Sequence, residues 1–170
     1  MSSRWITAAW CGLAAVLLIV AATSSRWLVA DVTGLGSSVS ARIGLTSLKV
    51  CASTLGDAQC KEVAWTELPG QIDGGGWMWI GRATFALGLI AALGLIALGG
   101  MAVAELEVQL PIPLPRIVMW PCLALLPFIG AYYMLPPNAF SELSAGRGFA
   151  FGIAGSVLGA FAAWRQLDDR

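Results

Sequence analysis

The chain has 170 residues, of which 58% are hydrophobic and 12% are charged, and its formal net charge is zero. Soluble domains carry about 25% charged residues, so this composition excludes an ordinary soluble protein and indicates a membrane protein. Histidine is absent, which removes the commonest general base and metal ligand, and there is no long basic run to bind nucleic acid. We therefore expect no enzyme, no metal, no cofactor and no nucleic-acid partner.

The first element is an apolar run over residues 5–23 that carries no charge. It is long enough for a membrane-spanning helix, which needs about 20 residues. Arg4 precedes the run and small residues end it at Ala21-Ala22, a pattern that also fits a cleaved signal peptide. A first membrane span is the prediction, with the signal peptide as its alternative.

Residues 24–76 form a long polar loop whose apolar positions predict β-structure. Apolar residues alternate with polar ones at Val39, Ala41, Ile43 and Leu45, which is the period of a half-buried strand. The phase changes at Thr46-Ser47, which indicates a bulge or a break between strands. Residues 27–32 and 60–65 are further strand candidates. We expect a small antiparallel sheet on the outer surface.

Two cysteines of this loop flank a turn-like segment with glycine at its centre, residues 55–58. Cys51 and Cys60 are therefore expected to close a hairpin as a disulfide in the oxidising compartment. Such a bridge contributes about 2.5–3 kcal/mol by the loop-entropy estimate. Two free thiols, or separate partners for each, are the alternative. Cys11 and Cys122 lie in apolar runs, where a thiol behaves as a small hydrophobic group.

Three more apolar runs follow, at residues 77–104, 117–135 and 148–164. Pro127 is interior to the third, so a kink is expected there. The short outer loop 136–147 carries Phe140, which is either a partner contact or an anchor at the membrane interface.

The fourth run has small residues at helical spacing, which lets two helices approach closely. They are Gly148, Gly152, Gly155, Ser156 and Gly159. This face packs either within a four-helix bundle or against a neighbouring protein.

Basic residues in the short segments place both termini in the cytoplasm, and the long loop outside, under the positive-inside rule. The protein is expected in the plasma membrane, or in the inner membrane if the source is bacterial, as abundant arginine, alanine and glycine suggest. Aromatic residues are expected at the outer membrane interface. They are Trp27, Trp77, Trp79, Tyr132 and Tyr133.

Several of these features together resemble the claudin superfamily, which includes the peripheral myelin proteins and the calcium-channel gamma subunits. Trp27 follows the first span, Gly44-Leu45 precedes Cys51, and Arg82 stands at the start of the second span. The eight residues between the loop cysteines fit the claudin spacing. Thr46 stands where claudins have the tryptophan of their Gly-Leu-Trp element, and the hydrophobic carboxyl-terminal motif of claudins is absent.

The resemblance implies one domain over residues 1–170, a left-handed four-helix membrane bundle capped by the disulfide-closed outer sheet. It also implies a non-enzymatic role in which the outer loop binds copies of itself or other membrane proteins, in self-assembly, adhesion or barrier formation. An accessory subunit of a larger membrane complex is the alternative, and a lipid-binding protein is a further one. Membrane lipids are expected partners in each case.

In claudins an arginine at the corresponding place supports the loop, and Arg82 resembles it in position. Here we expect it to reach the base of the sheet and to pair with Asp31, Glu67 or Asp73, or with loop carbonyl groups. Because it lies one turn inside Trp79, interfacial anchoring is its alternative role.

Overall fold

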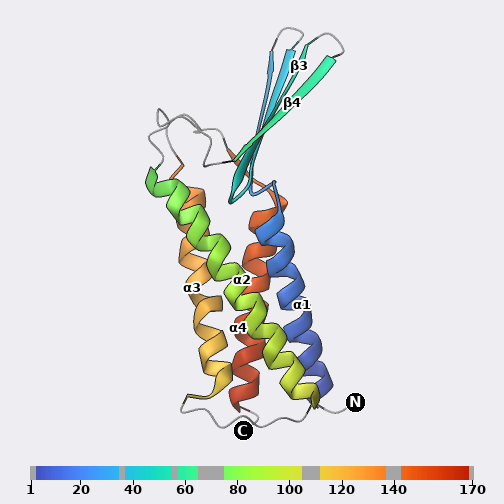
Figure 1. Ribbon diagram of the computed structural model, residues 1–170, viewed down its shortest axis with the longest axis vertical. Coiled ribbons are helices and arrows are strands. Elements are labelled where there is room, and N and C mark those ends of the chain that lie inside the picture. The colour runs from blue at the N-terminus through green and yellow to red at the C-terminus, as the bar shows by residue number, and fades with distance from the viewer. Residues whose placement is uncertain are drawn as a thin grey trace.

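The structure is a computed structural model that describes residues 3–34, 37–54, 57–64, 75–104, 112–136 and 143–168. In the described part of the chain, four helices form a bundle and a five-stranded antiparallel sheet stands on one end of it (Figure 1). The first helix begins, and the last helix ends, at the opposite end of the bundle (Figure 1). The expected combination of a four-helix bundle and a small sheet is confirmed.

The helices are α1 (Ser3–Thr23), α2 (Gly75–Ala104), α3 (Leu114–Met134) and α4 (Arg147–Asp168). All four are long and apolar enough to cross a membrane. They match the expected spans, although α4 continues four residues beyond residue 164.

α3 begins at residue 114, three residues earlier than expected, because prolines that precede the predicted span form its N-terminus. Pro113 is its N-cap and Pro115 follows in the first turn, where a missing N–H costs nothing. The helix then continues through Pro121 and Pro127.

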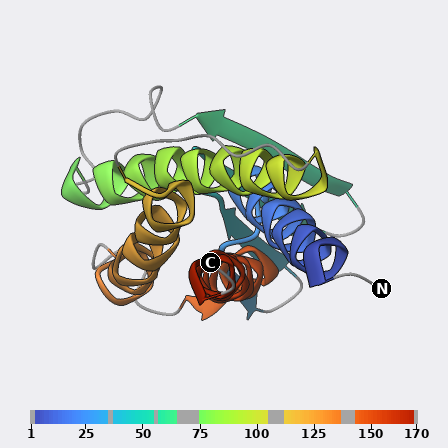
Figure 2. The same ribbon diagram turned by 90° about the horizontal axis from the view of Figure 1, so that it is seen from below.

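The four helices form a ring in which α1 packs against α2 and α4, and α3 packs against the same two helices (Figure 2). Contacts across the diagonal between α2 and α4 are few. With 30 residues, α2 is about 45 Å long at about 1.5 Å per residue, which exceeds a hydrocarbon core of about 30 Å. A helix of this length tilts or projects from the bilayer.

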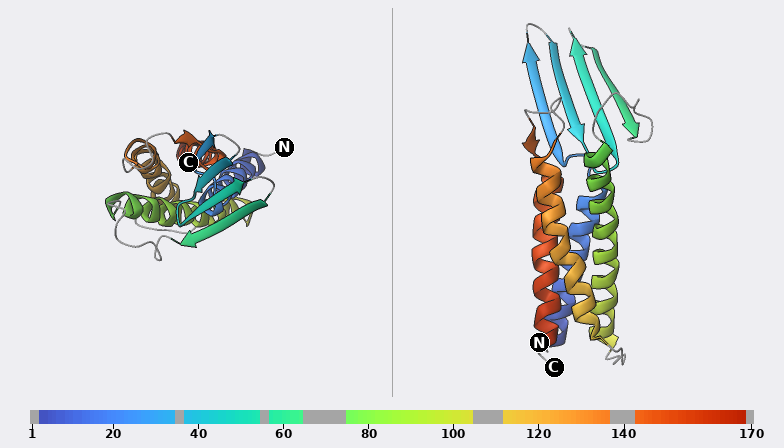
Figure 3. Two further views of the ribbon diagram at one scale, coloured as in Figure 1. Left: turned by 90° about the horizontal axis from the view of Figure 1, so that it is seen from above. Right: turned by 90° about the vertical axis from the view of Figure 1, so that its left-hand side faces the viewer.

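The sheet has the strand order β4-β3-β2-β1-β5, with every pair antiparallel. Its strands are β1 (Leu28–Gly34), β2 (Ser37–Ile43), β3 (Ser47–Thr54), β4 (Asp57–Ala64) and β5 (Ser144–Ala145). The strands continue roughly along the direction of the helices, so the sheet stands on the bundle (Figure 3). The expected phase change corresponds to the break between β2 and β3.

Three aromatic residues expected at the membrane interface are in fact part of the core. Trp27, Trp77 and Tyr132 are 1%, 5% and 0% exposed. They can be buried because each polar atom finds a backbone carbonyl partner inside the protein. Trp79 and Tyr133, by contrast, are exposed.

Candidate interaction surface and its anchor

The sheet has one apolar and one polar face, because side chains alternate along each strand and the register aligns them across strands. Leu28, Ile43 and Leu48 form the row of the apolar face nearest to the bundle, and all three are buried. They belong to the same core cluster as the helices. The base of the sheet and the end of the bundle therefore share one hydrophobic core.

Further from the bundle, no described residue packs over the apolar face, and its side chains are exposed. Val39 is 43% exposed and Ala52, its cross-strand partner, is also exposed. On the edge strand β4, this face ends in the exposed residues Gln59 and Lys61. An apolar centre with a polar rim is the usual composition of a protein–protein contact.

The other face of the sheet is polar and carries the disulfide. Ser38, Ser40 and Asp31 lie on it in β1 and β2. Cys51 and Cys60 are opposite each other in β3 and β4 and are bonded, with Cα atoms 4.1 Å apart. The expected disulfide is confirmed, and it joins the edge strand covalently to the rest of the sheet.

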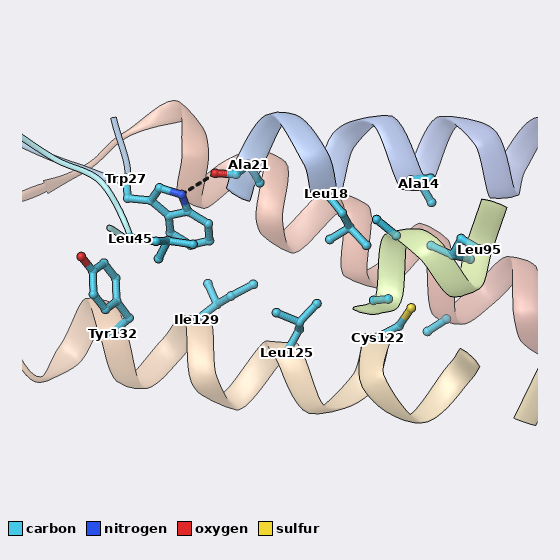
Figure 4. Packing of buried hydrophobic residues seen from close by; sticks show 14 of the residues in the cluster. Ala14, Leu18, Ala21, Trp27, Leu45, Leu95, Cys122, Leu125, Ile129 and Tyr132 are labelled. Atoms are coloured by element: carbon cyan, nitrogen blue, oxygen red, sulfur yellow. Dashed lines mark hydrogen bonds between the residues drawn. The ribbon is translucent and has the colours of Figure 1, made fainter. Parts of the chain in front are cut away.

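Trp27 holds the sheet on the bundle, since it stands between the end of α1 and the start of β1. Its indole Nε1 donates a hydrogen bond of 2.6 Å to the Ala21 carbonyl, and its backbone N–H donates to the Ile43 carbonyl at 2.8 Å. Figure 4 shows the indole in the helical core near Leu45 and Ile129. The same residue thus bonds to a helix and to a strand.

Tyr132 makes a second link between bundle and sheet from the end of α3. Its hydroxyl group donates to the Gly44 carbonyl at 2.8 Å. Its ring stacks on Trp77, with centroids 4.6 Å apart, and meets the edge of Trp27. Trp77 Nε1 donates to the Tyr132 carbonyl at 2.8 Å, which fixes the start of α2 to the end of α3.

Gly44 and Leu45 occupy the turn between β2 and β3. A Cβ atom at Gly44 would lie 3.2–3.3 Å from the backbone of Ser24, Ser25 and Ser47, so a larger residue there fits only if this backbone shifts by a few tenths of an ångström. Leu45 is 1% exposed and belongs to the core cluster. The pair resembling the claudin motif therefore forms the contact point between the sheet and the helices.

The small residues of α4 face the interior of the bundle. A Cβ atom at Gly148 or Gly152 would lie 2.8 Å from the indole of Trp27, and one at Gly155 would lie 2.9 Å from Leu18. One at Gly159 would lie 2.9 Å from Cys122 Sγ and from Leu95 Cδ1. Buried Ser156 bonds to its own helix, through the Gly152 carbonyl at 2.7 Å. This face of α4 contacts the other helices of the same chain.

The remaining predicted site residues are Arg82 and Phe140. Arg82 lies over the ring of Trp79, with its guanidinium carbon 5.5 Å from the ring centroid, so the contact seen for it is a cation–π interaction. Two of its expected partners, Glu67 and Asp73, lie outside the described residues, as does Phe140.

A small cavity lies beneath Trp27, between the helices. Its lining is apolar apart from Thr84 and includes Leu18, Leu125 and Ile129. Its volume of about 10 Å³ is space for about one water molecule. This cavity is far too small for a lipid acyl chain.

Sequence reasoning missed the roles of Tyr132 and β5. Tyr132 is one of two adjacent tyrosines, and nothing in the local pattern shows which one turns inward. β5 has only two residues, Ser144 and Ala145, and pairs with Leu28 and Val29. So short a strand has no periodicity to detect.

These features define a four-helix bundle whose helices are long and apolar enough to cross a membrane, with a disulfide-closed antiparallel sheet on one end of it. Comparisons with protein-family models and with curated proteins give no match for this chain.

Proposed function

We propose that this chain is a non-enzymatic membrane protein that recognises copies of itself, or other membrane proteins, through the apolar face of its sheet. The observation that carries the proposal is the extension of this face beyond the bundle, with Val39 43% exposed. An antiparallel sheet commonly has one face packed against other protein and one face in water. Here the polar face is the one suited to water. The apolar face is therefore the one that gains from a partner.

The anchoring of the sheet supports recognition by a rigid surface. The disulfide and the two links to the bundle through Trp27 and Tyr132 limit its movement. A preformed surface loses less conformational entropy on binding.

The resemblance to the claudin superfamily supports the same class of function. The combination of four helices, a first-loop sheet and the Cys51–Cys60 disulfide is what that resemblance implies. Within that class we propose self-assembly, adhesion or barrier formation in the plasma membrane, or in the inner membrane of a bacterium, with the sheet outside and both termini in the cytoplasm. An accessory subunit of a larger complex is the alternative.

The test is to place a charge on each face of β2 at neighbouring positions. Val39→Asp puts a carboxylate in the centre of the proposed contact, whereas Ser38→Asp puts the same group on the polar face as a matched control. We expect Val39→Asp to weaken assembly roughly tenfold or more, because a buried unpaired charge costs several kcal/mol. The measurement is the mass of the complex in mild detergent by light scattering.

The composition of the complex separates the two roles. Particles that contain only this chain indicate self-assembly, and a fixed ratio to one larger protein indicates an accessory subunit. If both variants assemble like the wild type, or if the wild type is a monomer in native membranes, the proposal is wrong.

A further inference from the structure

Three arginines meet where the sheet joins the bundle, although they are far apart in the sequence. Arg26 lies between α1 and β1, Arg42 lies near the end of β2, and Arg147 is the first residue of α4. We refer to Arg26, Arg42 and Arg147 as the arginine junction. No part of the function proposed above requires it.

The backbone geometry brings these residues together. The Gly148 N–H donates to the Arg26 carbonyl at 3.0 Å, which joins the start of α4 to the chain leaving α1. Arg42 lies opposite Val29 in the register, and Val29 pairs on its other side with Ser144, three residues before Arg147. The junction is thus held by the pairing of β5, β1 and β2.

The electrostatics of the junction are repulsive. The positive charges of Arg42 and Arg147, followed by some desolvation, lower the pKa of Arg26 below its usual value. Lys49 lies opposite Arg42 on the same face of the sheet, and the acidic Glu62 lies opposite Lys49 at the edge of that row. Asp31 is on this face too, opposite Ser40 and one step further from the bundle. A cluster of positive side chains favours the binding of an anion.

The position of the junction indicates which anion. The apolar stretch of α1 ends at Thr23, three residues before Arg26, and that of α4 begins at Arg147, so these two arginines lie at the ends of the apolar spans. Exposed Trp79 and Tyr133 near the same ends of α2 and α3 mark this level as a membrane interface. Phospholipid phosphate groups lie at this depth.

We propose that the arginine junction binds the phosphate of an anionic phospholipid headgroup. Guanidinium groups match phosphate oxygens with paired hydrogen bonds, and several of them can share one phosphate. A bound headgroup neutralises the repulsion and holds the junction of sheet and bundle at a defined depth in the membrane.

The test compares two double variants that change the net charge equally. Arg42→Gln/Arg147→Gln removes two charges from the junction, and Arg116→Gln/Arg165→Gln removes two from the opposite end of the bundle. The full chain in detergent is titrated with phosphatidylglycerol, and bound lipid is counted by native mass spectrometry. Each basic residue contributes about fivefold to the affinity for an anionic lipid. We therefore expect the junction variant to bind phosphatidylglycerol about thirtyfold more weakly and the control variant to bind it like the wild type.

Further measurements distinguish an effect of lost charge from an effect of misfolding, and binding of a lipid headgroup from binding of free phosphate. Arg42→Lys/Arg147→Lys keeps the charge and is expected to keep most of the affinity, and formation of the Cys51–Cys60 disulfide reports on folding in every variant.

Equal binding of phosphatidylglycerol by the two glutamine variants overturns the proposal. So does equal binding of phosphatidylcholine, or displacement of the lipid by inorganic phosphate at a similar concentration. Val39→Asp leaves the junction intact, so a failure of the sheet contact and a failure of lipid binding are distinguishable.

Discussion

At the scale of single residues, the junction of sheet and bundle depends on a few side chains whose polar atoms point inward. Trp27 is the most connected of them. Its backbone carbonyl accepts the Gly146 N–H at 2.8 Å, and its indole is enclosed by α4 at Gly148 and Gly152. Burying so large a ring is favourable only because its one polar atom is paired.

Trp27→Phe tests that pairing. The Ala21 carbonyl keeps the Ser24 N–H as a partner, so the loss is one hydrogen bond and part of the ring contact. We expect the free energy of unfolding to fall by about 1–2 kcal/mol, measured by thermal unfolding in detergent micelles. Trp79→Phe, at a site 68% exposed, should have almost no effect. Equal effects of the two changes would contradict the assigned role of Trp27.

Gly152→Ala tests the close contact from the other side. The added methyl group would lie 2.8 Å from Trp27 and 3.2 Å from Ile129, so a side chain must move. Overpacking of this kind costs about 1–3 kcal/mol, against the better helix propensity of alanine. Gly130→Ala in α3 is the control, because its methyl group meets nothing within 4 Å. Thermal unfolding should show a lower stability for Gly152→Ala and no loss of stability for Gly130→Ala.

At the scale of elements, the sheet is covalently closed at its outer edge and non-covalently held at its base. β4 has β3 as its neighbour in the strand order, and the disulfide joins these two strands. The base of β1, in contrast, is bonded to β5 and to the start of α4. The edge strand therefore depends most on the disulfide.

Replacing both cysteines, as Cys51→Ser/Cys60→Ser, should lower the stability of the β3–β4 hairpin by about 2.5–3 kcal/mol. Hydrogen exchange measured by mass spectrometry should show faster exchange in β3 and β4. Exchange in α1–α4 should be nearly unchanged, because the core cluster is dominated by helical residues. Uniformly faster exchange in the helices would mean that sheet and bundle unfold as one unit.

At the scale of the whole molecule, the two ends of the bundle differ in kind. One end carries the sheet, and the other carries the start of α1, the end of α4 and the start of α3 (Figure 1). If the four helices cross a bilayer, the sheet and these ends lie on opposite sides of it.

Single introduced cysteines test this arrangement. Ser38→Cys lies on the sheet and Arg116→Cys lies at the other end, while natural Cys11 and Cys122 are buried. In sealed vesicles of one orientation, a membrane-impermeant thiol reagent should label one variant and spare the other. Both sites should react after detergent is added. Labelling of both in intact vesicles would contradict a spanning bundle.

Much of this architecture could be predicted because it depends on local patterns. Helix length follows from apolar runs, and the sheet follows from alternation around Val39–Leu45 and from the placement of Cys51 and Cys60. The inward direction of Tyr132 and the arginine junction could not be predicted, because they depend on contacts between different segments; Tyr132 and Gly44, for example, are 88 residues apart. Patterns within one segment carry no information on such contacts.

The enclosure of Trp27 by α4 has a consequence for biogenesis. Trp27 and the first strand leave the ribosome long before the last helix, yet Trp27 packs against Gly148 and Gly152, and the strand pairs with Ser144 and Ala145. Until that last helix folds against the others, the indole lacks the part of its surroundings that α4 supplies. We therefore expect a chain truncated before α4 to be incompletely folded where the sheet joins the bundle.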